Sequence, residues 1–272
     1  MIPPSFTYVR ASSVDEALDL AATHGEDAKY LAGGHSLLPL MKLRFAAPAV
    51  LIDLGRIAEL SYVRDAGTYV AIGALTRHHD VATSGLLKRE IPLLAHTAEA
   101  VGDPQIRHRG TIGGSVAHGD SASDLPASLL ALEASFVIRG AGGTRSVPAG
   151  EFFKGIFETA IEPGELLTEI QVPKPAAPDA WSFQKFTKRA IDWAIVGVAV
   201  QGGKVALINV GPTPLRATAT ENALAAGATV ADAAALAAEG TSAGSDIHAS
   251  KEFREHLTRV LVRRALEEAA SR

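Results

Sequence analysis

Two loops built around glycine pairs constrain what this chain can form more than any other feature. The first is Ala32-Gly33-Gly34-His35-Ser36, and the second is Thr111-Ile112-Gly113-Gly114-Ser115. Glycine pairs let the backbone approach a ligand closely and let successive N–H groups point into one concavity, which suits an anion such as a diphosphate. Either loop alone is also compatible with an ordinary glycine-rich turn. Neither contains the dinucleotide motif G-x-G-x-x-G or the Gly-Lys-Ser/Thr of a P-loop.

The residues around the first loop predict a small β-loop-α-β unit. Ser13 and Glu16 have the spacing of a capping box, in which the Ser hydroxyl and the Glu carboxylate each accept from an unpaired backbone N–H at the start of a helix. The loop itself lies between a short strand at Lys29–Ala32 and a helical stretch that starts at Leu37. This stretch leads to a second apolar strand at Val50–Asp53.

The middle of the chain alternates predicted hairpins with helical segments. Turn residues between short apolar runs predict two antiparallel hairpins and one further strand. Their strands are expected at Ser61–Arg64, Tyr69–Ile72, Phe136–Ile138, Arg145–Val147 and Leu166–Val172. Helical segments are expected at Arg77–Thr83, Leu86–Val101 and Leu125–Leu132.

A proline-rich stretch, Pro173–Pro178, is the clearest domain boundary, because three prolines in six residues form a stiff linker. Beyond it, an alanine-rich helical region follows three predicted strands. The last helix is expected to carry one apolar stripe. The predicted lobes are residues 1–56, 57–173 and 179–272. The strands are expected at Trp181–Thr187, Ala194–Gln201 and Lys204–Val210, and the stripe at Phe253, Leu257, Val260 and Leu261.

Composition narrows the possible functions. The chain has no cysteine, so it has no thiolate nucleophile and no cysteine-held iron–sulfur cluster. Its 26 Lys and Arg against 30 Asp and Glu give a net charge of −4, which does not favour nucleic acid as a partner. The longest apolar run, Ala194–Val200, is much shorter than a membrane span, and the N-terminus lacks a secretory pattern. A soluble, cytoplasmic protein is therefore expected.

The residues around both loops resemble the FAD-binding signatures of a known family. Leu31–Arg44 (LAGGHSLLPLMKLR) is similar to the first signature. Arg109–His118 (RGTIGGSVAH), continuing to Ser123–Ala127 (SDLPA), is similar to the second. The family is the flavoprotein (medium) subunit of molybdenum hydroxylases of the carbon monoxide dehydrogenase and xanthine dehydrogenase type. The resemblance covers essentially the whole chain.

The resemblance implies an α+β chain with the FAD-binding fold of the vanillyl-alcohol-oxidase/cresol-methylhydroxylase type. Two α/β lobes would hold an extended FAD between them. A C-terminal α+β domain with a three-stranded antiparallel sheet and helices would follow.

The same resemblance implies which residues contact FAD. Ala32–Ser36, flanked by Leu31 and Leu37, would wrap the pyrophosphate, and Thr111–Ser115 would meet the diphosphate and ribityl region from the other lobe. Asp124 would bind a polar group of the cofactor, most simply a ribose hydroxyl. The remaining expected contacts are Val101, His118, Leu167, Lys185 near the flavin ring, and Trp193 stacked on it.

Several of these residues also have simpler interpretations. Asp124 is well placed to cap the helix that follows it. Lys185 fits a solvated lysine on a strand, and Trp193 fits a buried or domain-interface tryptophan. Related carbon monoxide dehydrogenase subunits usually have tyrosine at this last position, so the indole is a departure that changes access to the flavin. No metal site is expected, because the neighbouring His78 and His79 do not share a helix face.

The expected function is that of an FAD-carrying electron-transfer subunit of a heterotrimeric molybdenum hydroxylase. A large molybdopterin subunit would oxidise the substrate, a small 2Fe-2S subunit would pass the electrons on, and an external acceptor would receive them. No catalytic residue beyond the flavin is expected on this chain, and the family suggests a dimer of heterotrimers. Two alternatives remain open: a stand-alone FAD-dependent oxidoreductase, and a non-catalytic nucleotide-binding or assembly module. The sequence identifies neither the substrate nor the acceptor.

Overall fold

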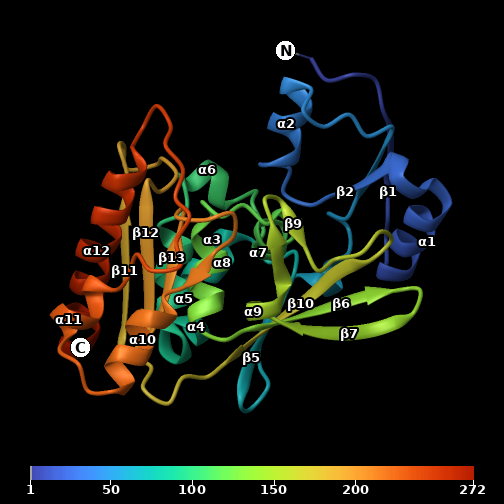
Figure 1. The fold of residues 1–272 in the computed structure, drawn as a ribbon. Helices are drawn as coiled ribbons and strands as arrows, with labels where there is room; N and C mark the ends of the chain where they lie inside the picture. Colours follow the sequence, from blue (N-terminus) through green and yellow to red (C-terminus); the bar gives the residue numbers. More distant parts are fainter. Residues whose placement is uncertain (1) are drawn as a thin grey trace.

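A computed structural model describes residues 2–272, which form three main sheets in chain order. Figure 1 shows the N-terminal lobe at the upper right, the middle lobe below it, and the C-terminal sheet with its helices on the left. The 3₁₀ turns η1 (Gly25–Asp27) and η2 (Ala58–Leu60) lie in the first two of these parts. The predicted division at residues 56, 173 and 179 remains a prediction.

The N-terminal lobe contains a three-stranded parallel sheet in the order β1-β3-β2. Helices α1 and α2 make the crossovers that parallel strands require. The predicted β-loop-α-β unit is confirmed, but β1 was not predicted, because its residues are mostly exposed and lack an apolar alternation. The elements are β1 (Thr7–Arg10), α1 (Val14–His24), β2 (Ala28–Leu31), α2 (Leu37–Leu43) and β3 (Val50–Asp53).

The capping box of α1 closes one residue earlier than predicted. Ser13 Oγ accepts from the Glu16 backbone N–H at 3.1 Å, as expected. The Glu16 carboxylate, however, accepts from the backbone N–H of Ser12 at 2.7 Å and from the Ser12 hydroxyl at 2.5 Å. Ser12 offers two donors to the carboxylate, which accounts for this choice.

The middle lobe is a five-stranded antiparallel sheet in the order β4-β5-β10-β6-β7. Both predicted hairpins are confirmed. A separate two-stranded hairpin, β8-β9, extends the lobe. The strands are β4 (Val63–Asp65), β5 (Tyr69–Gly73), β6 (Ser135–Gly140), β7 (Gly143–Pro148), β8 (Phe153–Gly155), β9 (Glu158–Thr159) and β10 (Leu166–Pro173).

Seven short helices belong to the described part of this lobe. The prediction of one helix over Leu86–Val101 is wrong, because α4 ends before Ile91 and α5 starts at Pro92. Proline has no backbone N–H to donate, so it breaks a helix but suits the first position of a new one. The helices are α3 (His78–Thr83), α4 (Gly85–Glu90), α5 (Pro92–Glu99), α6 (Pro104–Arg107), α7 (Ile112–His118), α8 (Asp124–Ala131) and α9 (Ala149–Phe152).

The C-terminal sheet has four antiparallel strands in the order β11-β12-β13-β14, not the three that were predicted. The missed strand, β14, has two residues, which is too short for an alternating pattern to mark it. The elements are β11 (Trp181–Phe186), β12 (Val196–Gln201), β13 (Lys204–Ile208), β14 (Leu215–Arg216), α10 (Thr218–Ala225), α11 (Val230–Ala235) and α12 (Lys251–Ser271).

Helix α12 packs on β11 and β12, with a buried face that differs in part from the predicted stripe. Leu257 and Leu261 are buried as expected, but Phe253 is 43% exposed. Arg254 is buried instead, because its guanidinium donates to Ile195 O and pairs with the Asp246 carboxylate. None of the helices in residues 2–272, α12 included, has both the length and the apolar composition that crossing a bilayer requires.

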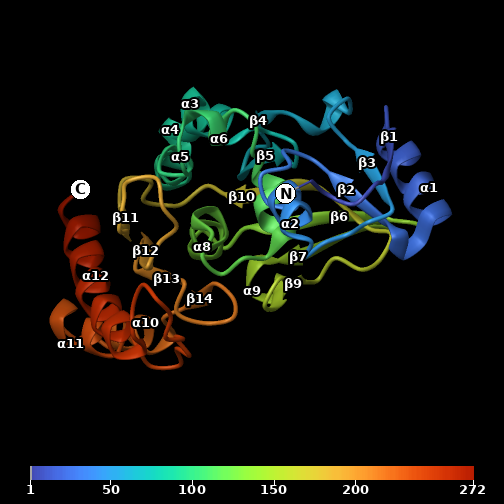
Figure 2. The same ribbon diagram turned by 90° about the horizontal axis from the view of Figure 1, so that it is seen from above.

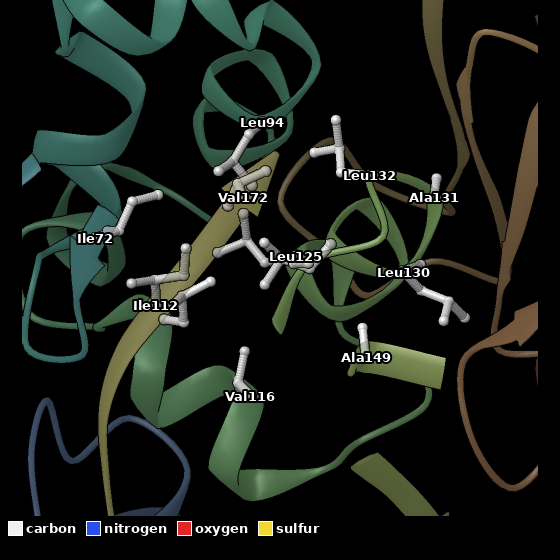
Figure 3. Packing of buried hydrophobic residues seen from close by; sticks show 14 of the residues in the cluster. Ile72, Leu94, Ile112, Val116, Leu125, Leu130, Ala131, Leu132, Ala149 and Val172 are labelled. Atoms are coloured by element: carbon white, nitrogen blue, oxygen red, sulfur yellow. The ribbon is translucent and has the colours of Figure 1, made fainter. Parts of the chain in front are cut away.

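One continuous core joins the middle lobe to the C-terminal sheet. Helix α8 packs against β12 and β13 on one side and α7 on the other, and Figure 2 shows it between the two sheets. Figure 3 shows part of this core, where Leu94, Leu125 and Val172 approach one another from α5, α8 and β10. The shared core sets α8 and β11 in fixed relation, and the functional site depends on this.

We expect Phe136→Ala to lower the free energy of unfolding by about 3–5 kcal/mol. Phe136 is 0% exposed, and its ring meets the edge of Phe152 at 4.5 Å between centroids, so truncation leaves a cavity. Chemical denaturation followed by circular dichroism measures the change. Phe45→Ala is the control, because Phe45 is 79% exposed. Equal effects of the two substitutions would contradict the assignment of Phe136 to the core.

Candidate functional site

A cavity of about 1420 Å³ lies between the lobes and is the main candidate site. Both glycine loops line it, together with residues of β10 and β11 and of the segment before β12. Its volume exceeds the ~300–1,000 Å³ of most small-ligand pockets, which suits an extended ligand.

The first glycine loop presents a row of free backbone donors to this cavity. In residues 2–272, the N–H groups of Gly33–Ser36 donate to no protein acceptor, although Gly34 O and Ser36 O accept from the following turn. Gly34 has φ +77°, a left-handed conformation that glycine adopts without strain. The Ser36 hydroxyl makes no capping bond to α2. Gly33 is buried, so its unpaired N–H is costly unless a ligand satisfies it, and the free N–H groups that follow it suit an anionic ligand.

The second glycine loop differs from the predicted nest, because its donors are already used. The N–H of Ile112 donates to Thr76 O and that of Gly113 to Ala74 O. The N–H of Gly114 donates to the hydroxyl of Thr111, which caps α7, and that of Ser115 donates to Thr111 O. This loop therefore supplies a close wall and two hydroxyl groups rather than a row of free amides.

The two loops touch at their backbones. A Cβ on Gly33 would lie 2.8 Å from Gly110 Cα and closer still to Arg109 O. Real Cβ atoms do not tolerate such contacts, so the loop needs glycine at position 33 for the N-terminal and middle lobes to meet. The wall of the cavity depends on this approach.

Asp124 and Lys185 form an ion pair at the cavity wall. Lys185 Nζ lies 2.7 Å from Asp124 Oδ2 and also donates to Ala100 O at 3.2 Å. The two side chains are 10% and 7% exposed, and Asp124 Oδ1 is buried with no partner in residues 2–272. Burial raises the pKa of Asp124 to about 6, against the opposing effect of Lys185. Oδ1 is thus a hydrogen-bond acceptor left unsatisfied at the wall of the cavity.

Most of the simpler interpretations of these residues do not hold. Asp124 is the first residue of α8 rather than its cap, and its side chain bonds Lys185 only. Lys185 is buried rather than solvated. Trp193 is 57% exposed, so it is not a core tryptophan, and it borders the cavity between the lobes with Ile191 and Asp192.

Most other predicted contacts also reach the cavity. Leu167 lies at a bulge in β10, and Val101 follows Ala100, which accepts from Lys185. His118 borders the cavity, with its ring 4.9 Å from that of Phe157. Leu31 and Leu37 flank the first loop as expected. Their roles in binding remain predictions.

Ile112 is the exception among the predicted contacts. Its side chain is 0% exposed and lies in the hydrophobic core with Ile72 and Val116 (Figure 3). Ile112 is the first residue of α7, which packs on β10. Its side chain therefore points into the core, whereas Gly113 and Gly114 line the cavity. Conversely, sequence analysis missed His78, which lines the cavity, because its pair with His79 was weighed only as a metal site.

Known proteins match the chain over nearly its full length. Residues 4–175 match the family model of the FAD binding domain in molybdopterin dehydrogenase, and residues 181–269 match that of the CO dehydrogenase flavoprotein C-terminal domain. The chain belongs to this flavoprotein family. The predicted family, its fold and FAD as its cofactor are thereby confirmed.

Individual relatives agree with this family. The carbon monoxide dehydrogenase medium chain of Hydrogenophaga pseudoflava is 42% identical over 285 residues, covering 100% of this chain and 99% of its own. The crystal structure of carbon monoxide dehydrogenase from that organism matches this flavoprotein with a TM-score of 0.95 at 44% identity, covering 100% and 99% of the two chains. Quinoline 2-oxidoreductase from Pseudomonas putida 86 matches with a TM-score of 0.93 at 33% identity, with 100% and 99% covered.

We expect Gly33→Ala to abolish FAD retention, because the added methyl group would push the backbone at Arg109 and Gly110 away from the first loop. Flavin released from the purified protein by denaturation measures retention. Gly85→Ala is the matched control, since a Cβ there meets nothing within 4 Å. Full flavin content in the Gly33 variant would show that the close contact is not needed.

We expect the free energy of unfolding of the ligand-free Asp124→Asn variant, relative to the wild type, to be higher at about pH 7.5 than at about pH 4, by at most about 3 kcal/mol. Burial raises the folded-state pKa to about 6, above the ordinary value of 3.8. The protonated carboxyl therefore supports folding at low pH, and this contribution is lost as the pH rises through about 6. Urea denaturation of both proteins at the two pH values measures the difference, and a pH-independent difference would contradict it.

Proposed function

We propose that the cavity holds FAD and that the chain works as the electron-transfer subunit of a heterotrimeric molybdenum hydroxylase. The observation that carries this proposal is the row of free N–H groups at Gly33–Ser36, in one cavity with the unpaired Asp124 Oδ1. The amides would hold the diphosphate, and Asp124 would accept from a hydroxyl of the sugar or ribityl chain. When bound, FAD supplies electron transfer in steps of one or two electrons.

The residues near the far end of the cavity would surround the flavin ring. Lys185 would place its positive charge close to the ring while remaining paired with Asp124. Leu167 and Val101 would pack against the ring and exclude water. Trp193, exposed at the cavity edge, would cover it with an indole, which offers a larger apolar face than the tyrosine usual in the family.

The electrons would come from another subunit. The chain has no cysteine and so cannot hold an iron–sulfur cluster with thiolates. Its relatives are named medium chains or subunits of dehydrogenases, which supports a small 2Fe-2S subunit and a large molybdopterin subunit as partners. An external acceptor, assembly as a dimer of heterotrimers and a cytoplasmic location belong to the same proposal.

This chain does not select the substrate. Relatives at 35–42% identity over nearly the whole chain are named for carbon monoxide, glyceraldehyde and nicotine, which share no recognition chemistry. A division of labour in which the flavoprotein never meets the substrate explains this breadth. It also accounts for a site built from backbone donors, a carboxylate and a lysine.

The test is an absorption spectrum of the chain purified together with co-expressed small 2Fe-2S and large molybdopterin subunits. We expect flavin bands near ~370 and ~450 nm together with iron–sulfur absorbance, and bleaching of both on addition of the substrate. The chain alone should show no bleaching, because it lacks the clusters and the molybdenum centre. Substrate-dependent bleaching of the isolated chain would favour the stand-alone oxidoreductase, and assembly without any flavin would favour the binding module.

A further inference from the structure

His78 is a buried polar residue of the cavity that the proposed FAD contacts leave unused. It is the first residue of α3 and only 6% exposed. Its backbone N–H donates to Gly110 O at 3.0 Å, and a Cβ on Gly110 would lie 2.7 Å from His78 Nε2. The imidazole therefore packs directly on Gly110, the residue that leads into the second glycine loop.

The two ring nitrogens of His78 differ in their surroundings. Nδ1 is fully buried and has no hydrogen-bond partner in residues 2–272. Nε2 lies beside Gly110, and both residues belong to the cavity wall. Nε2 also has no hydrogen-bond partner in residues 2–272, but unlike Nδ1 it is not fully buried, so it is the ring nitrogen that a ligand in the cavity can reach.

The protonation of the ring follows from its environment. Burial, with a smaller contribution from the neighbouring His35, Arg77 and Arg107, lowers the pKa of His78 to about 4. The imidazole is therefore neutral near pH 7 and carries a single N–H. In folded proteins a buried N–H without an acceptor is rarer than a buried acceptor without a donor. The fully buried Nδ1 is therefore assigned as the unprotonated nitrogen, and the proton is assigned to Nε2.

We propose that His78 is a further ligand-binding residue, whose Nε2–H donates a hydrogen bond to the diphosphate held by the first glycine loop. The imidazole and the first loop are close neighbours, because both contact Gly110 and all three line the same cavity. The neutral N–H would extend the row of free amides with a side-chain donor from the middle lobe. This inference rests on the proposed FAD site.

A purely structural role is the alternative, with the ring acting only as a spacer under Gly110. Three substitutions separate the two roles. His78→Gln places an amide N–H where Nε2 lies, His78→Asn places one where Nδ1 lies, and His78→Phe keeps a ring of similar size without any donor.

The experiment measures binding to the flavin-depleted complex of the chain with its partner subunits. The probes are FAD, ADP, which keeps the diphosphate without the flavin ring, and riboflavin, which keeps the ring without phosphate. We expect the Phe and Asn variants to bind FAD and ADP roughly 10- to 100-fold more weakly than the wild type, as loss of a hydrogen bond to a charged group requires. Riboflavin binding should not change, and the Gln variant should remain close to the wild type.

Other outcomes would overturn the inference. Equal binding of ADP by all four proteins, or equal losses for ADP and riboflavin, would leave His78 a structural role. Rescue by Asn but not by Gln would assign the bond to Nδ1. If the Phe variant fails to fold by circular dichroism, the Gln and Asn variants still give the comparison. If the wild-type complex binds neither FAD nor ADP, the proposed function fails and this inference falls with it.

Discussion

The cavity exists because two backbone segments from different lobes come into direct contact at Gly33 and Gly110. Any side chain at position 33 would separate them, and the amides of the first loop would then face solvent instead of an enclosed wall. The second loop completes this wall, and its N–H groups donate hydrogen bonds to oxygens of Ala74, Thr76 and Thr111. One loop is therefore rigid and satisfied, and the other is held against it with its donors free.

The other end of the cavity depends on a buried ion pair that joins helix α8 to the C-terminal sheet. Asp124 begins α8, and Lys185 belongs to β11 beyond the proline linker. Burying two charges is costly unless they are paired and hydrogen-bonded. Here Lys185 Nζ donates two hydrogen bonds, to Ala100 O and Asp124 Oδ2, whereas Asp124 Oδ1 has no partner in residues 2–272. The site thus retains an unsatisfied acceptor that a ligand hydroxyl can satisfy, held in place by the core shared between α8 and the C-terminal sheet.

These features suit a subunit that carries a cofactor for a larger enzyme. Free amides, an unpaired carboxylate oxygen and a neutral imidazole can recognise a phosphate-bearing ligand, but they do not discriminate between oxidisable substrates. Trp193 is exposed and lies at the edge of the same cavity.

The local pattern of residue types was sufficient to predict many of the strands and the family of this protein. Apolar alternation and turn residues predicted both hairpins and three C-terminal strands, and the two long glycine motifs identified the family and its cofactor. It was insufficient for β1 and β14, for the helix break at Pro92, and for the pairing of Asp124 with Lys185. The glycine pairs alone also suggested two equivalent nests, and the family resemblance placed Ile112 in the site. Which amides stay free, which side chain faces the core and which charges meet are set by groups distant in sequence, so they follow from folding in three dimensions.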